Sequence, residues 1–324
     1  MKAIVYEQYG GPGMLRAEEM EQPVPKDDEV LVKIYAVSIN EWDWGLLTGK
    51  PWINRMLFGW KKPKFKILGS DIAGRIESVG KNITKFKPGD EVYGDLSERW
   101  GGFAQYVCAP EKLLVLKPAA MSFEQAAAIP QAAMLAIQGL RDRGKIKHGQ
   151  KILINGAGGG VGSFGIQIAK LYNAEVTGVD NTYKQEMMRS MGFDHVIDYT
   201  QEDFTRTGRR YDMILDVKTN RSPFSYLRAL NRGGVYVTVG GSLGRLFQAL
   251  VLSPFISLFG RKHIRIVALK TNKDLPYVNK LFNAGKLKPV IDGHYRLEDI
   301  HRAFDVYAKA EHKGKLVLTV NHPE

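Results

Sequence analysis

Residues 151–162 read KILINGAGGGVG, an apolar run followed by five glycines in seven positions. The run is typical of a buried strand, and the next residues, VGSFGIQIAKLYNA (161–174), are typical of a helix. A helix N-terminus offers unpaired N–H groups and a partial positive charge, and glycine lets the backbone come close to an anion. The stretch therefore predicts a pyrophosphate-binding turn, and the alternative is a tight structural turn.

An acidic residue follows the glycines at the spacing of a dinucleotide-binding unit. Asp180 ends the next predicted strand, 175–180, about 20 residues further along the chain. An acid there can bind the ribose hydroxyls of NAD and would repel the 2′-phosphate of NADP. Lys184 and Arg189 follow and could reach a phosphate, so the sequence indicates NAD or NADP without choosing. The alternative for Asp180 is an acid that stabilises a helix N-terminus.

The rest of the chain divides into a β-rich front and an alternating second part. Residues 1–120 hold short β-branched runs between Gly, Pro and Asp, which favours a barrel-like antiparallel unit. Residues 121–263 alternate strands and helices, as in a doubly wound parallel sheet, and residues 264–324 form a return segment. Ser122 and Gln125 predict a capping box before a helix that continues to residue 140. Thr200 and Asp203 predict the cap of a short helix.

Composition limits the other function classes. The 324 residues suggest two domains, and the single cysteine, Cys108, excludes an internal disulfide or a four-cysteine zinc site. With no secretion signal or apolar run of spanning length, we expect a cytoplasmic protein. A net charge of +12 fits a solvated basic surface, an anionic cofactor or an anionic membrane face. Nucleic acid is the weakest interpretation, because the basic residues are scattered.

The order of these parts resembles the medium-chain dehydrogenase/reductase superfamily. Within it, the chain resembles the zinc-independent quinone oxidoreductase (zeta-crystallin-like) branch, and especially the subgroup that contains reticulon-4-interacting protein and chloroplast envelope quinone oxidoreductase-like proteins. The resemblance implies a Rossmann domain (121–263), a β-rich GroES-like catalytic domain (1–120 and 264–324) and a homodimer. The motifs that carry it are MKAIVYEQYGGP, AVSINEWDW, GSDIAGRIESVG, KPGDEVYG, GAGGGVGSFGIQIAK, GFDHVIDYT and KPVIDGHYRLEDIHRAFDVYAKAEHKGKLVLTV.

The same comparison argues against catalytic zinc. Zinc members carry a cysteine where this chain has Ser38 or Asn40, and Gly-His-Glu within the segment that reads LGSD (68–71) here. Because zinc prefers sulfur and nitrogen ligands, we expect no metal. The resemblance then implies hydride transfer from NAD(P)H to a quinone or an α,β-unsaturated carbonyl. The alternatives are a metal-free alcohol dehydrogenase-like enzyme and an NAD(P)H-binding redox sensor or scaffold with little turnover.

The resemblance also implies site residues. Asn40 and Asp43 would orient the substrate or the nicotinamide ribose, unless they only secure a turn and a helix cap. No proton donor is assigned. Relatives carry two glycines near 219–220, where this chain reads Thr-Asn, and Lys315 is expected only to begin the last strand. The predicted cofactor residues are Ala157, Gly159, Gly160, Val161 and Gly162 at the pyrophosphate, Asp180 and Lys184 at the ribose, and Asp216, Val217, Val239, Gly240, Gly241 and Lys270 at the nicotinamide.

Two further stretches combine apolar and basic residues. Residues 246–259 read LFQALVLSPFISLF and precede Arg261 and Lys262, and residues 52–66 read WINRMLFGWKKPKFK. Neither is long enough to span a bilayer. They fit buried packing or a dimer contact, or else an access route for a lipophilic substrate or a membrane-surface patch.

Overall fold

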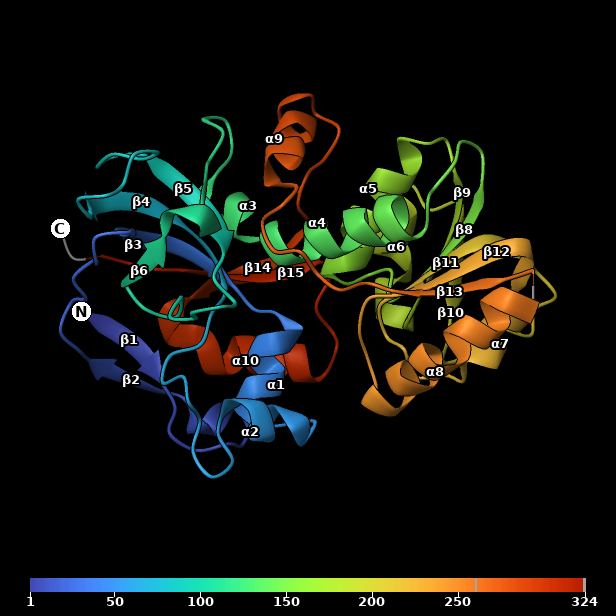
Figure 1. Cartoon of the computed structure of the whole chain (residues 1–324), viewed down its shortest axis with the longest axis horizontal. Coiled ribbons are helices and arrows are strands. Elements are labelled where there is room, and N and C mark those ends of the chain that lie inside the picture. The colour runs from blue at the N-terminus through green and yellow to red at the C-terminus, as the bar shows by residue number, and fades with distance from the viewer. Residues whose placement is uncertain (260, 323–324) are drawn as a thin grey trace. The chain divides into compact units, whose positions relative to one another are not determined.

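The computed structural model describes residues 1–259 and 261–322, with side chains omitted for 257–259. The chain forms two compact units, drawn with their elements in Figure 1. The first unit holds Met1–Gln131, Thr271–Asn283 and Ile291–Glu324, and the second holds Ala132–Lys270 and Ala284–Val290. The chain therefore crosses from one unit to the other more than once, and each unit is described by itself.

The first unit is built on a mixed sheet whose central strand is β3 (Glu29–Ser38). The strand order is β14-β15-β3-β4-β5-β7, β6 pairs with β3, and β1 and β2 form a separate antiparallel pair. The strand β3 is almost wholly buried because it contacts neighbours along its whole length. The other strands are β1 (Lys2–Val5), β2 (Arg16–Glu19), β4 (Asp71–Val79), β5 (Glu91–Asp95), β6 (Tyr106–Pro110), β7 (Val115–Leu116), β14 (Ile291–Arg296) and β15 (Lys315–Thr319).

Short helices close this unit and share its core. The ring of Phe304 in α10 packs 5.9 Å from Phe103 and 6.3 Å from Trp44 in α1, measured between ring centroids. The return segment thus completes the core of the N-terminal part. The helices and 3-10 turns are α1 (Glu41–Thr48), α2 (Ile53–Phe58), α3 (Phe123–Ala127), α9 (Leu275–Asn283), α10 (Ile300–Ala308), η1 (Pro12–Met14), η2 (Glu111–Leu113) and η5 (Leu297–Asp299).

The second unit is a doubly wound parallel sheet. Its strand order is β10-β9-β8-β11-β12-β13, and every neighbouring pair is parallel. Figure 1 shows α5 on one side of this sheet and α7 and α8 on the other, as right-handed crossovers require. The expected fold class is confirmed. The strands are β8 (Lys151–Asn155), β9 (Glu175–Asp180), β10 (His195–Asp198), β11 (Tyr211–Asp216), β12 (Leu230–Thr238) and β13 (His263–Ile266).

The connecting segments of the second unit are mostly short. The long exception is α8 (Leu243–Phe259), which contains Pro254 and covers the segment predicted at 246–259. Among the described residues, no helix is long and apolar enough to cross a membrane. The remaining elements are α4 (Pro130–Ile137), a π-helical turn η3 (Gln138–Arg143), α5 (Gly160–Lys170), η4 (Thr182–Lys184), α6 (Gln185–Ser190) and α7 (Pro223–Arg228).

Three local expectations need correction. The helix predicted up to residue 140 is divided into α3, α4 and η3, although its Ser122–Gln125 capping box is confirmed. The helix predicted at Thr200 and Asp203 is a series of turns, in which Asp203 instead accepts from Thr205. The first boundary lies at residue 131 rather than 120, because α3 packs against β3 and β4, and the second lies at 270 rather than 263, because β13 joins the parallel sheet.

Candidate functional site

The glycine-rich stretch lies between β8 and α5, as the sequence predicts. The amides of Gly156 and Ala157 both donate to the carbonyl of Val179, at 2.9 and 3.1 Å, so the turn is fixed to the neighbouring strand. Gly156 has a φ of +84°, which favours glycine. The helix α5 begins at Gly160, and its first amides have no acceptor within the helix.

The glycines of this loop serve different purposes. A β-carbon at Gly162 would lie 2.4 Å from the carbonyl oxygen of Ala157, so glycine is required for the helix to pack on the turn. A β-carbon at Gly159 would meet nothing nearer than 3.6 Å, and its φ of −90° suits any residue. Neither packing nor backbone conformation explains a glycine at 159. A bare backbone at a helix N-terminus fits the close approach of a pyrophosphate.

Asp180 and Lys184 lie beside the loop, where the sequence places them. The carboxylate of Asp180 accepts from the amides of Gly158 and Asn181, both at 2.9 Å, and lies 3.5 Å from the ammonium of Lys184. Both side chains are buried, and the Lys184 stem passes over Gly158, where a β-carbon would meet it at 2.5 Å. Asp180 therefore shapes the glycine loop in addition to any contact with a ribose, a role that the sequence did not indicate.

The predicted nicotinamide segment follows β11 and β12. Asp216 is fully buried, and its carboxylate accepts from Asn155 at 2.7 Å, from the Tyr236 hydroxyl at 2.8 Å and from the Lys218 amide at 3.2 Å. Burial raises the pKa of Asp216 above its usual range. Its side chain thus links three strands, and the contact of Asp216 with the cofactor stays a prediction. Val217 donates its amide to the Asn155 carbonyl at 3.0 Å.

Two glycines follow β12, one packed closely against Thr219 and one with open space around it. Gly241 has a φ of +127° and pairs with Thr219, so that a β-carbon at 241 would lie 2.6 Å from the Thr219 amide nitrogen. Gly240 has no atom within 4 Å of an added β-carbon and, like Gly159, is not needed for packing. Thr219, near which the family resemblance implies glycine, is buried against Thr238. Its side chain is therefore accommodated inside the protein.

Val239 and Lys270, the other two residues predicted at the nicotinamide, differ in burial but are both held by backbone hydrogen bonds. Val239 is half-buried, and its amide donates to the Asp216 carbonyl at 3.0 Å. Lys270 has an exposed side chain, and its backbone is held by the Gln138 amide group at 2.8 and 2.9 Å. Gln138 belongs to the π-helical turn η3, so this turn fixes the position of Lys270. The contact was not foreseen from the sequence.

In the first unit, Asn40 and Asp43 lie at the start of α1. One carboxylate oxygen of Asp43 accepts the Asn40 amide and the other accepts the Gly69 amide, both at 2.8 Å. Asp43 is fully buried, and burial raises its pKa to about 7. Each carboxylate oxygen thus holds one backbone amide, and a contact of Asp43 with substrate or ribose stays a prediction. This geometry agrees with the alternative from the sequence, in which Asp43 caps the start of α1.

A buried lysine completes the arrangement around Asn40. The Lys315 ammonium donates to the Asn40 side-chain oxygen and, at 3.1 Å, to the Ile39 carbonyl, and it lies 3.7 Å from Asp71. Burial lowers the pKa of Lys315, while the carboxylates of Asp71, Asp43 and Asp95 oppose that shift. Burial also raises the pKa of Asp71 to about 7. We call Asn40, Asp43, Asp71 and Lys315 the polar cluster.

The polar cluster fixes the orientation of the Asn40 side-chain amide. Lysine is only a donor, so the Asn40 oxygen must face Lys315 and the NH₂ group must face away. That NH₂ group donates to the Ser70 hydroxyl at 3.3 Å, and a side-chain hydrogen bond from Asn40 also acts on Asp71, where it lowers the pKa of the carboxyl against the effect of burial. The sequence did not indicate this role for Lys315, because 275 residues separate it from Asn40 and no local pattern connects them.

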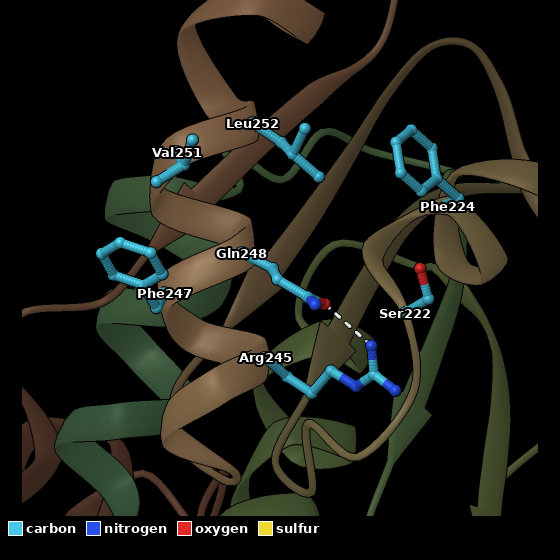
Figure 2. A pocket seen from close by; sticks show the side chains of 7 residues that line it. All are labelled: Ser222, Phe224, Arg245, Phe247, Gln248, Val251 and Leu252. Carbon is cyan, nitrogen blue, oxygen red and sulfur yellow. Dashed lines mark hydrogen bonds between the residues drawn. The ribbon is translucent and has the colours of Figure 1, made fainter.

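Helix α8 contributes a pocket within the second unit. Figure 2 shows Phe224 and Ser222 of the α7 region facing side chains of α8, with the Arg245 guanidinium donating to the Gln248 amide oxygen at 2.8 Å. Phe224 and Phe247 are 59% and 67% exposed, so the pocket is open to solvent and its walls combine apolar with polar side chains. The predicted segment 246–259 is therefore only partly buried, since Ala249 is covered whereas Leu250 and Phe255 are exposed. The pocket is lined by Ser222, Phe224, Arg245, Phe247, Gln248, Val251 and Leu252.

Comparisons with known proteins cover the whole chain. Residues 26–119 match the alcohol dehydrogenase GroES-like domain family, and residues 191–318 match a family described as zinc-binding dehydrogenase. All of the chain aligns at 33% identity with 79% of 2-methylene-furan-3-one reductase from Solanum lycopersicum. At 32% identity, 98% of the chain aligns with 79% of the chloroplastic NADPH-dependent alkenal/one oxidoreductase of Arabidopsis thaliana.

A solved structure agrees with these matches. The quinone oxidoreductase from Coxiella burnetii superposes with a TM-score of 0.87 at 25% identity, over 99% of each chain. The GroES-like and Rossmann architecture expected from the sequence is thereby confirmed. The chain belongs to the medium-chain dehydrogenase/reductase superfamily, in its quinone oxidoreductase-like branch.

Proposed function

We propose that this protein is a zinc-independent reductase that uses NAD(P)H to reduce a quinone or an α,β-unsaturated carbonyl. The observation that carries the proposal is the polar cluster. Where the family resemblance places the metal ligands of zinc dehydrogenases, this chain has Asn40 and Asp71 of the polar cluster and, beside them, the Ser70 hydroxyl. The relatives named as a furanone reductase and an alkenal/one oxidoreductase support the same class of substrate.

The donor set of the polar cluster does not fit zinc. A zinc ion prefers cysteine sulfur and histidine nitrogen, and the three side chains above supply only oxygen and amide groups. The Lys315 ammonium is already bonded to Asn40 and Asp71, so a divalent cation would have to lie against a buried positive charge. Among the described residues, no group of His, Cys, Asp and Glu side chains could hold a metal ion.

The glycine loop fits the pyrophosphate of a nicotinamide dinucleotide. Gly159, Gly160, Val161 and Gly162 would offer backbone amides at the start of α5. Bound NAD(P)H supplies the hydride. Lys184 and two backbone amides offset the charge of Asp180, which reduces its repulsion toward a 2′-phosphate. We therefore propose that NADPH is preferred over NADH, in agreement with the relative whose name states NADPH dependence.

Asn40 is the proposed substrate-contacting residue. In the reaction its NH₂ group would exchange its hydrogen bond to Ser70 or Asp71 for one to a carbonyl or quinone oxygen, which gains negative charge when the carbon skeleton accepts hydride. Lys315 and Asp43 act as positioning residues, because one holds the Asn40 side chain and the other its backbone amide. A polar donor that is already oriented needs no reorganisation during the reaction.

Fluorescence titration with NADPH and NADH, followed by steady-state oxidation of the preferred coenzyme with quinones and enals, tests this proposal. Turnover that survives dialysis against a zinc chelator supports it. Coenzyme binding without turnover on any acceptor would instead indicate a sensor, and turnover only with simple alcohols or aldehydes would indicate a dehydrogenase. The cytoplasmic location and the homodimer stay predictions, which cell fractionation and light scattering would test.

A further inference from the structure

The segment 50–66 of the first unit exposes large apolar side chains together with a concentrated positive charge. Trp52, Met56, Leu57 and Trp60 are 62%, 55%, 60% and 64% exposed. Soluble proteins seldom leave several large apolar side chains of one short segment in water without a use for them. The segment has no acidic residue, and its basic residues are Lys50, Arg55, Lys61, Lys62, Lys64 and Lys66.

This exposure belongs to a segment that is firmly held. The rings of Phe58 and Phe65 lie 5.9 Å apart, and Phe65 lies 6.1 Å from the buried Trp100. The Lys64 amide donates to the Phe58 carbonyl at 2.7 Å, which folds the chain back after α2. Two aromatic residues thus anchor the segment in the core while the tryptophans stay outside. We call Trp52, Met56, Leu57, Trp60, Lys61, Lys62 and Lys64 the aromatic–basic face.

Among the described residues, the lysines of the aromatic–basic face lack an acidic partner, and the Lys64 ammonium lies over the Phe65 ring, 5.7 Å from its centroid. Lys66, just beyond the face, pairs with Glu18 at 3.3 Å. In the part of the chain that the structure describes, no ion pair involves Lys61, Lys62 or Lys64. A second copy of this face would bring like charges together in a two-fold contact, which opposes self-association.

Exposed tryptophans and lysines in one short segment match the chemistry of a membrane surface. Tryptophan places its ring at the headgroup level, aliphatic side chains enter the acyl boundary, and lysines meet anionic headgroups. Met56 and Leu57 would gain nothing from stacking on nucleic acid bases, but they gain from an acyl environment. The helix α2 is six residues long, so the contact lies on the bilayer and does not cross it. We propose that the aromatic–basic face docks this protein peripherally on an anionic lipid bilayer.

Vesicle co-sedimentation tests the proposal with the full chain. We expect binding to vesicles of equal parts phosphatidylcholine and phosphatidylglycerol, no binding to pure phosphatidylcholine, and weakening by salt. The variant K61E/K62E/K64E should bind the anionic vesicles about 100-fold more weakly. Trp52→Ala with Trp60→Ala should weaken binding roughly tenfold. The control K26E/K87E/K313E makes the same change in net charge on other exposed lysines of the first unit and should retain most of the binding.

Coenzyme titration and thermal melting of each variant report whether the protein remains folded. Absence of binding to the anionic vesicles overturns the proposal. Equal losses in K61E/K62E/K64E and in its control also overturn it, because binding would then follow net charge alone. If the molecular mass in solution rises with protein concentration and is lower for the tryptophan variant, the face is a self-association site, and the membrane proposal is overturned. Retention of vesicle binding in both face variants would place the contact elsewhere.

Discussion

The glycine loop of the second unit and the polar cluster of the first unit are constructed by opposite means. The loop consists mainly of glycines, which have no side chain. At Gly159 the atom nearest to an added β-carbon would lie 3.6 Å away. The polar cluster instead fills its space with charged side chains, where Asp43 and Asp71 are fully buried and Lys315 is 4% exposed. One region offers backbone to an anion, whereas the other uses buried charges to orient a single amide.

The two regions also differ in how far apart in the sequence their interacting residues lie. Every part of the loop lies within one strand–turn–helix, so a change there acts on the immediate backbone. The polar cluster joins α1, β4 and β15, and each member depends on partners from distant parts of the chain. Substitutions in the loop should therefore affect coenzyme binding, while substitutions in the cluster should affect stability and substrate turnover.

The largest effect is expected for Gly162→Val. Its side chain would press against the Ala157 carbonyl oxygen, 2.4 Å from the new β-carbon, and separate α5 from the turn. We expect coenzyme binding to be abolished and the melting temperature to fall, measured by NADPH fluorescence titration and thermal denaturation. Normal affinity in a folded variant would contradict the packing role assigned to Gly162.

A strong effect is also expected for Lys315→Met. Removal of the ammonium leaves buried carboxylates without their cation, which should cost about 3 kcal/mol of stability. It also frees the Asn40 amide to rotate, so kcat for quinone reduction should fall while NADPH affinity stays normal. Lys87→Met, at an exposed lysine of the same unit, is the matched control. Unchanged kcat in Lys315→Met would remove Lys315 from the positioning of Asn40.

The pH dependence of stability should distinguish the cluster from the loop. Asp71 has a pKa of about 7 in the folded protein and near 4 when unfolded, so the folded state binds the extra proton between these values. Its contribution to stability is therefore present at low pH and lost as the pH rises toward 7. The melting temperature of the wild type relative to Asp71→Asn should be higher near pH 5 than near pH 8. The opposite slope would contradict this protonation.

A smaller effect is expected for Asp180→Ala. The substitution removes the acceptor of the Gly158 amide, and the net value of such a hydrogen bond corresponds to roughly tenfold in affinity. Because this bond shapes the loop, NADPH and NADH should both bind more weakly, with NADH affected more if the carboxylate also holds its ribose. Titration with both coenzymes measures the ratio. A loss confined to NADH would restrict Asp180 to the ribose.

The sequence predicts the loop better than the cluster for the same physical reason. Glycine spacing, the apolar strand 152–155 and Asp180 are close in sequence, so local rules place them correctly in the fold. Tyr236 donates a hydrogen bond to Asp216, and Lys315 donates one to Asn40. Both contacts depend on the order and register of the strands, which the local pattern of residues does not specify. The division of the helix before residue 140 likewise depends on tertiary packing. The resemblance to a family supplied candidates at these positions but not their partners.

The central claim is that the backbone at the start of α5 receives the pyrophosphate of NAD(P)H, and Gly159→Val tests it most directly. Position 159 has room for a β-carbon and a φ of −90°, so neither a clash at the β-carbon nor backbone strain opposes folding of the variant, and its melting temperature reports whether it is folded. Gly13→Val, at another open glycine, is the control. We predict that NADPH titration detects no binding to Gly159→Val and normal binding to Gly13→Val. Wild-type affinity in a folded Gly159→Val protein would contradict the account.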